Sequence, residues 1–116
     1  MTLNHLNLAV ADVLQTQELL EKYFELQRLI PGSSALAIMN DDNGLVLTLS
    51  NFNKAAAVAY PEDFHLGFRQ ETAAQVDALY ERLRADGFAI DAPRKQHGSW
   101  TFYWREPGGL LIEVLH

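Results

Sequence analysis

The feature that most constrains the fold is an internal repeat, because the two halves of the chain show the same order of expected elements. Each half begins with a short strand of alternating apolar and polar residues, continues with an amphipathic helix, and ends with three further strands. His5 and His65 occupy the same place in these first strands, within Asn-His-Leu and Phe-His-Leu. Gly44-Leu-Val-Leu-Thr48 closes the first half as Gly109-Leu-Leu-Ile-Glu113 closes the second. The pattern predicts an α+β protein of two βαβββ modules in tandem.

Local signals mark the ends of several elements. Asp12 is expected to cap the first helix, and Thr72-Ala-Ala-Gln75 has the form of a capping box for the second helix, which Gly87 should end. Asn43-Gly44 predicts a hairpin, and Glu106-Pro-Gly-Gly109 predicts a tight turn before the last strand. The expected strands are residues 3–10, 26–30, 35–39, 45–50, 64–69, 88–90, 100–104 and 110–115.

Length and composition indicate one ordinary globular domain. The 116 residues allow a first module at about 1–52, and a connector and second module at about 53–116. A net charge of −6 argues against nucleic acid or an anionic membrane as the partner. The absence of cysteine excludes thiolate nucleophiles and cysteine-ligated metals. No signal peptide or transmembrane run is recognisable, so the expected location is cytoplasmic.

Glu113 is the one charged residue in the otherwise apolar run from Leu110 to Leu115. An ionised carboxylate in a buried strand is costly unless it is paired or binds a cation. His5 and His65 are its best candidate partners, because the repeat puts both at the start of equivalent strands. Each histidine taken singly is better explained by a structural role. Together with Glu113, the two predict a metal site.

The opening segment Asn4–Asp12 and the closing segment Phe102–Glu113 resemble the vicinal oxygen chelate superfamily. This superfamily includes glyoxalase I, the extradiol ring-cleaving dioxygenases, the fosfomycin-inactivating enzymes and the bleomycin-binding proteins. Its closing hairpin usually carries Asp-Pro-(Asp/Glu)-Gly, where this chain has Glu-Pro-Gly-Gly. The resemblance covers essentially the whole chain. It implies paired modules whose sheets curve around a cavity, and a metal held by the first and last strands of each module.

Carried over to this sequence, the family pattern puts His5, His65 and Glu113 at three ligand positions. The fourth ligand, a glutamate in glyoxalase I, falls on Thr48, or on Leu47 if the gap is placed differently. Neither residue is a suitable ligand, which counts against glyoxalase I chemistry. Two histidines and one carboxylate suit a divalent ion with open positions, such as Fe or Mn, with Ni, Co and Zn as further candidates. A substrate would chelate such an ion through adjacent oxygens.

Tyr103 lies ten residues before Glu113, on the expected partner strand. In extradiol dioxygenases and fosfomycin-inactivating enzymes the same spacing places a tyrosine beside the metal. The resemblance therefore implies that its phenol donates a hydrogen bond to a substrate oxygen or acts as a general acid. A core aromatic residue with its hydroxyl at the rim is the alternative.

Four further residues are candidates for contact with the substrate. Asn7, Thr48 and Thr101 are expected on the faces that the resemblance assigns to the cavity. His97 stands in Lys95-Gln-His-Gly98, which is expected to be a polar loop, and it is a candidate for proton transfer. An exposed loop histidine is the alternative for His97.

Two classes of function remain open on the sequence. The first is a small metal-dependent enzyme, with dioxygenase, lyase or transferase chemistry, acting on a small molecule. The second is a non-catalytic protein of the bleomycin-resistance type, which sequesters its ligand; retention of all three ligand residues favours the enzyme. The resemblance also implies a homodimer in which His5 of one chain joins His65 and Glu113 of the other.

Overall fold

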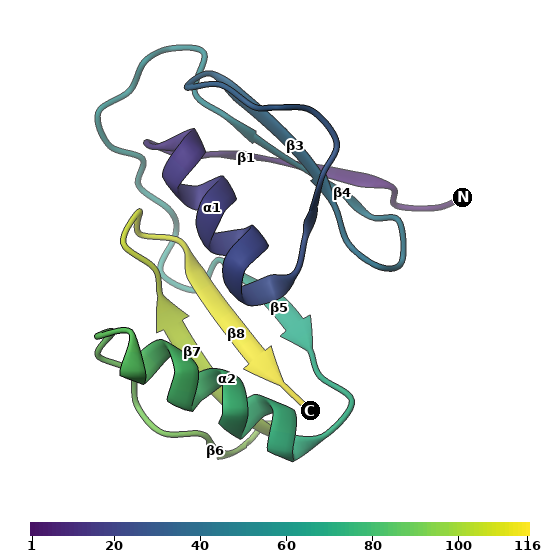
Figure 1. The fold of residues 1–116 in the computed structure, drawn as a ribbon, viewed down its shortest axis with the longest axis vertical. Helices are drawn as coiled ribbons and strands as arrows, with labels where there is room; N and C mark the ends of the chain where they lie inside the picture. The colour runs from purple at the N-terminus through teal and green to yellow at the C-terminus, as the bar shows by residue number, and fades with distance from the viewer. The chain divides into compact units, whose positions relative to one another are not determined.

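The computed structural model describes all 116 residues, which form two compact units, Met1–Ala59 and Tyr60–His116 (Figure 1). Each unit contains one helix and one four-stranded sheet in the order β-α-β-β-β. The predicted α+β fold of tandem βαβββ modules is therefore confirmed. No helix combines the length and apolarity needed to cross a membrane.

The first module builds its sheet in the order β1-β4-β3-β2. Strands β1 and β4 are parallel, whereas β3 is antiparallel to both of its neighbours. The predicted hairpin at Asn43-Gly44 joins β3 to β4, with Gly44 at a φ of +84°. The elements are β1 (His5–Ala9), α1 (Val13–Phe24), β2 (Gln27–Arg28), β3 (Leu36–Asn40) and β4 (Val46–Ser50).

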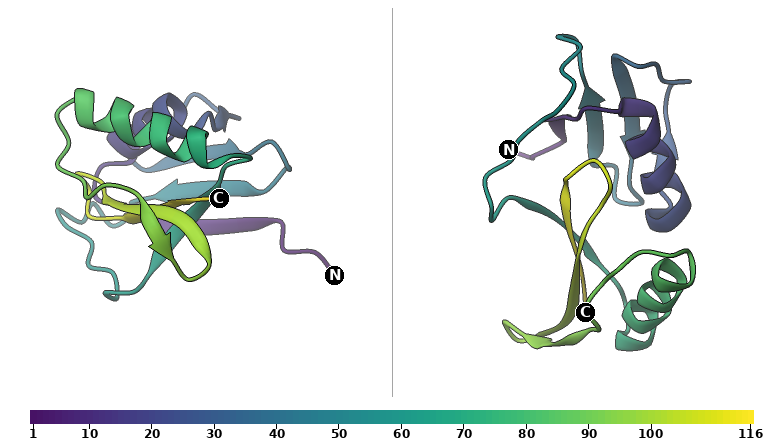
Figure 2. Two further views of the ribbon diagram at one scale, coloured as in Figure 1. Left: turned by 90° about the horizontal axis from the view of Figure 1, so that it is seen from below. Right: turned by 90° about the vertical axis from the view of Figure 1, so that its left-hand side faces the viewer.

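The second module repeats this topology with the strand order β5-β8-β7-β6. Strands β5 and β8 are parallel, and β7 is antiparallel to both β8 and β6. Helix α2 contacts β7 and β8 and lies along one side of this sheet (Figure 2). The elements are β5 (His65–Arg69), α2 (Ala73–Ala85), β6 (Arg94–Gln96), β7 (Ser99–Arg105) and β8 (Leu111–Leu115).

Alternation along the strands separates the two faces of each sheet. The face toward α2 is apolar and buried, as the ring contact between Tyr80 of α2 and Phe102 of β7 shows, with centroids 5.9 Å apart. The opposite face carries the polar residues of the same strands. The buried apolar residues of both sheets are Leu8, Ala37, Met39, Leu47, Leu49, Phe102, Trp104, Ile112 and Val114.

The predicted helix caps are confirmed. Asp12 Oδ1 accepts a hydrogen bond from the backbone N–H of Gln15 at 3.0 Å. Thr72 and Gln75 form the complete capping box, in which each side chain accepts from the other residue's N–H at 3.2 and 3.0 Å. Gly87, with a φ of +97°, follows the end of α2 as expected.

The strand predicted at residues 88–90 is wrong, because this segment has no strand in the structure. Its apolar residues serve the core instead: the ring of Phe88 packs on that of Trp104 with centroids 4.9 Å apart. The short apolar run Phe88-Ala-Ile90 belongs to an irregular segment that packs on the sheet, and an apolar run alone does not distinguish such a segment from a strand.

The second strand of the second module is polar, and part of it falls in the loop predicted at Lys95–Gly98. Arg94–Gln96 forms β6, which pairs antiparallel with β7. His97 and Gly98 form the connection, and both have positive φ, 50° and 80°. Two positive φ values are typical of the tight turns that join hairpin strands. A three-residue polar strand depends on its partner, so its own sequence does not predict it.

Gly32 offers a test of packing in the first module. Its φ is +83°, and a Cβ added there would lie 2.5 Å from Oε1 of Gln17, a fully buried residue. Gly32→Ala is expected to cost about 2–3 kcal/mol in free energy of unfolding, from the left-handed backbone and from displacing Gln17. Gly44→Ala is a matched control, since its φ is +84° and nothing lies within 4 Å. It should cost only about 1 kcal/mol. Urea denaturation would measure both, and equal losses would show that Gln17 moves aside freely.

Candidate metal and substrate site

Glu113, in β8, is the centre of a polar cluster on the sheet face opposite α2. Its Oε2 lies 3.3 Å from Nε2 of His65, and the two side chains are 14% and 37% exposed, respectively. Its Oε1 accepts a hydrogen bond from the Tyr103 hydroxyl at 2.8 Å, and the Thr101 hydroxyl is 3.1 Å from the same oxygen. The second module therefore brings three predicted site residues, His65, Tyr103 and Thr101, around the partly exposed carboxylate of a fourth, Glu113.

The register of β7 on β8 accounts for the contact between Tyr103 and Glu113. The two residues are direct partners across the antiparallel pair. Trp100 and His116 exchange both backbone hydrogen bonds, at 3.1 and 3.0 Å. Because such pairs alternate with pairs that share no backbone bond, Tyr103 and Glu113 form one of the latter, whose side chains lie closer together. The short contact follows from strand pairing.

The register of β5 on β8 places the histidine. Gly67 is the partner of Glu113, so no side chain of β5 stands directly beside the carboxylate. His65, two residues earlier, reaches across this gap, and its Nδ1 lies 2.8 Å from the carbonyl oxygen of Asp63. A carbonyl oxygen only accepts hydrogen bonds, so Nδ1 carries the hydrogen. In neutral His65 the other nitrogen, Nε2, then has a lone pair and no hydrogen.

This arrangement fits a cation. A neutral His65 turns the lone pair of Nε2 toward Oε2 of Glu113, 3.3 Å away, and two such atoms repel unless a proton or a metal ion lies between them. Metal bonds of about 2.1 Å would place adjacent donors about 3.0–3.4 Å apart, which matches the observed separation. A backbone carbonyl bound to the second ring nitrogen is also the usual support of a metal-binding histidine.

The phenol of Tyr103 is held in its protonated form. Burial raises the pKa of Tyr103 above its ordinary value of 10.0, and the hydrogen bond to Glu113 and the charge of that carboxylate raise the pKa further. The charge of Arg94 acts in the opposite direction. Tyr103 therefore remains a hydrogen-bond donor throughout the neutral pH range.

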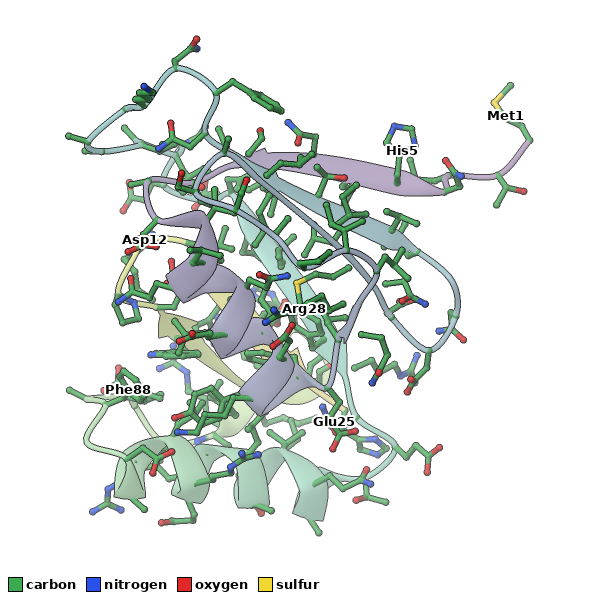
Figure 3. The ribbon with its side chains drawn as sticks, turned by 45° about the horizontal axis from the view of Figure 1, so that its top comes forward. Met1, His5, Asp12, Glu25, Arg28 and Phe88 are labelled. Atoms are coloured by element: carbon green, nitrogen blue, oxygen red, sulfur yellow. The ribbon has the colours of Figure 1, made fainter.

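His5, the third predicted ligand, lies in the first module. Its exposed ring projects from β1 (Figure 3), and Nδ1 lies 2.7 Å from Oδ1 of the neighbouring Asn4. The structure contains no group of three or more His, Cys, Asp or Glu side chains arranged to hold a metal ion. The second module alone supplies two of the three predicted ligands, His65 and Glu113.

The strand register decides which residue corresponds to Glu113 in the first module. Thr48 pairs with Asn7, two residues after His5, just as Glu113 pairs with a residue two positions after His65. Leu47, the other candidate, is buried on the opposite face. Thr48 is thus the counterpart of Glu113, and the first module has no carboxylate at this position.

Two of the predicted substrate contacts have other surroundings in the structure. Thr101 is only 1% exposed, and its hydroxyl lies 2.9 Å from the carbonyl oxygen of Val114 as well as near Glu113. His97 is in the exposed turn between β6 and β7, where Nε2 lies 3.2 Å from the side-chain nitrogen of Gln96.

One contributor to the site has no signal in the sequence. The carbonyl of Asp63, which orients His65, belongs to the backbone and leaves no trace in residue type. Gly67 is the register partner of Glu113, but a Cβ added there would meet only Leu115, at 3.8 Å, so no close approach requires this glycine.

The fold and the site define a class of protein with two βαβββ units. In one of these units the first strand carries a histidine, and the last strand carries a carboxylate that faces it. The chain belongs to the Glyoxalase/Bleomycin resistance protein/Dioxygenase superfamily, whose family profile matches residues 2–114. This is the superfamily that the opening and closing segments resemble. A search of curated proteins found no match.

Solved structures support the same membership. A possible glyoxalase from Bacillus cereus is 46% identical, with a TM-score of 0.89, and the match covers 100% of this chain and 99% of the other. The fosfomycin resistance protein FosX from Listeria monocytogenes, complexed with Mn(II) and sulfate, is 22% identical, with a TM-score of 0.78 over 98% and 88% of the chains. Lactoylglutathione lyase from Agrobacterium tumefaciens is 18% identical, with a TM-score of 0.77 over 98% and 92%. The last two similarities concern the fold.

Proposed function

We propose that the chain is a metal-dependent enzyme that acts on a small molecule able to chelate a divalent ion through two adjacent oxygens. The observation that carries this proposal is the pair formed by His65 Nε2 and Glu113 Oε2, 3.3 Å apart. The pair has the spacing of two neighbouring ligands, and it is oriented by the Asp63 carbonyl on one side and by hydroxyl groups on the other.

The third ligand in this proposal is His5. Its ring is exposed on β1, so it is free to reach a site completed by another copy of the chain. We propose a homodimer in which His5 of the partner subunit joins His65 and Glu113. Two nitrogens and one carboxylate leave coordination positions open for a substrate, and such a set suits Fe(II), Mn(II) or a similar ion.

The residues around the site have separate roles in this proposal. A bound ion would polarise the two substrate oxygens and stabilise negative charge that develops on them. His65 and Glu113 would hold the ion. Tyr103, protonated and beside Glu113, would turn its hydroxyl from Oε1 toward a substrate oxygen and donate a hydrogen bond or a proton there. Asn7 and Thr48 remain candidates for substrate contact in the first module.

The relatives keep two reaction types open within this proposal. FosX from Listeria monocytogenes is described as a fosfomycin resistance protein complexed with Mn(II), and its fold is shared by this chain. We therefore propose addition or lyase chemistry on a chelating substrate, with dioxygen chemistry as the second reaction type. A non-catalytic binding protein would need no ion, so metal content separates the two classes of function.

The test is metal analysis of the purified protein after removal of bound ions and loading in turn with Fe(II), Mn(II), Co(II), Ni(II) and Zn(II). We expect about one ion per chain for at least one metal, because two oriented ligands and a third histidine form a three-donor site. Glu113→Gln should lose the ion, whereas Glu71→Gln, at an exposed position, should retain it.

The same samples test the chelating substrate. Catechol offers two adjacent oxygens, and it should bind the loaded protein and not the metal-free protein, as measured by calorimetry. Absence of an ion under every loading condition would contradict the proposal and would favour a protein that binds its ligand without metal.

A further inference from the structure

We infer that Thr101 is a positioning residue which, with Tyr103, holds Glu113 so that only Oε2 faces an ion beside His65. The inference deepens the proposed function, on which its metal-binding consequence rests. It assigns Thr101 to the support of a ligand and not to contact with the substrate.

The two oxygens of Glu113 have different surroundings. Oε1 lies within hydrogen-bonding distance of two hydroxyls, Tyr103 Oη at 2.8 Å and Thr101 Oγ1 at 3.1 Å. Oε2 faces Nε2 of His65 at 3.3 Å. A carboxylate can bind an ion through one or both oxygens. With Oε1 engaged by hydroxyls, Glu113 presents one oxygen, and its orientation is set before any ion arrives.

Thr101 is suited to this role because its own position is strictly determined. The side chain is 1% exposed, and Oγ1 lies 2.9 Å from the carbonyl oxygen of Val114, the residue after Glu113. A β-branched side chain has few rotamers in a strand. The hydroxyl is thus confined between a backbone oxygen of β8 and the carboxylate, with one hydrogen to share between them.

The internal repeat provides a comparison within the chain. In the first module Thr48 takes the place of Glu113. Thr48 pairs with Ile38 across β3 and β4, and Glu113 pairs with Tyr103 across β7 and β8, so Ile38 is the counterpart of Tyr103. By the same register, Leu36 is the counterpart of Thr101. The module without the carboxylate has aliphatic residues at both hydroxyl positions. The hydroxyls therefore accompany the carboxylate and are not a requirement of the module fold.

The first test compares Thr101→Val with Thr101→Ser. Valine keeps the shape and removes the hydroxyl, whereas serine keeps the hydroxyl. We expect Thr101→Val to weaken Mn(II) binding about tenfold or more, the usual effect of losing a group that orients a ligand. Thr101→Ser should stay within about threefold of the unsubstituted chain. Competition with a chelator measures the affinity, and thermal unfolding of the metal-free chains reports stability separately. Equal Mn(II) affinity in all three chains would overturn the inference, even if valine lowered the unfolding temperature.

The second test needs no metal and so distinguishes this inference from the proposed function. A crystal structure of metal-free Thr101→Val should show Glu113 in a new rotamer or in several conformers, whereas Thr101→Ser should keep it in place. A Glu113 carboxylate unchanged in the valine variant, still bound to Tyr103 through Oε1, would overturn the inference. If the unsubstituted chain binds no ion, the proposed function fails and this crystallographic comparison alone decides the role of Thr101.

Discussion

Mixing His5→Ala chains with Glu113→Gln chains is expected to restore metal binding that neither variant has alone. In the proposed homodimer each site takes His5 from one chain and His65 and Glu113 from the other. A mixed dimer then combines both altered residues in one site and leaves the second site intact. Each variant alone should bind less than about 1% as tightly as the unsubstituted chain, since loss of a first ligand exceeds the 10–100-fold effect of an outer residue.

The measurement is metal content after unfolding and refolding the two variants together. We expect about one ion per mixed dimer. The controls are the two variants refolded separately and a mixture of His65→Ala with Glu113→Gln, in which both altered residues come from the second module. That control mixture should bind no metal. Each site takes His65 and Glu113 from the same chain, so each site of a mixed dimer carries one altered ligand. No recovery for the His5 mixture, with metal binding by the unsubstituted chain intact, would contradict shared sites.

Replacing Glu106 by alanine is expected to lower the free energy of unfolding by about 3–5 kcal/mol, the largest single effect on stability that we predict. Glu106 is 3% exposed and stands in the turn before β8. Its Oε2 accepts a hydrogen bond from the N–H of Gly108 at 2.7 Å, and its Oε1 accepts one from the N–H of Leu110 at 2.8 Å. Hydrogen bonds to a charged group are worth about 1.5–3 kcal/mol each, and alanine removes both.

Urea denaturation would measure the effect, with two comparisons. Glu106→Gln keeps one acceptor oxygen and should lose about half as much as alanine. Glu71→Ala, at an exposed position, should change stability by less than about 0.5 kcal/mol. A loss below about 1 kcal/mol for Glu106→Ala would show that the backbone of the turn is stable without the carboxylate. Because this turn leads into β8, a strongly destabilised variant should also lose the site around Glu113.

Most of the fold could be predicted from the sequence because its signals are local. Alternation marks β1 and β5, and the side chains of Asp12 and Thr72 cap the helices within one turn of their own positions. The repeat strengthened these predictions, because an element recognised in one module supports the prediction of its counterpart in the other. Strand β6 escaped prediction because Arg94–Gln96 is a strand only by virtue of its pairing with β7.

The sequence predicts which residues form the candidate site better than it predicts the contacts among them. A lone carboxylate in an apolar strand pointed to Glu113, and the repeat pointed to His5 and His65. The assignment of Thr48 over Leu47 required the register of β1 on β4. The buried position of Thr101 required the packed structure, since its hydroxyl alone would suit a substrate contact equally well.

The two modules, their element order and the candidate ligand residues are predictable from the sequence, because periodicity, capping and a charge in an apolar strand are properties of short segments. The atoms that face one another are known from the folded chain alone: Nε2 of His65 with Oε2 of Glu113, and two hydroxyls with Oε1. The physical reason is that strands distant in the chain pair through backbone hydrogen bonds, which every residue type can make. Their register, and with it the orientation of each side chain toward its neighbour, is set by the packing of the whole sheet.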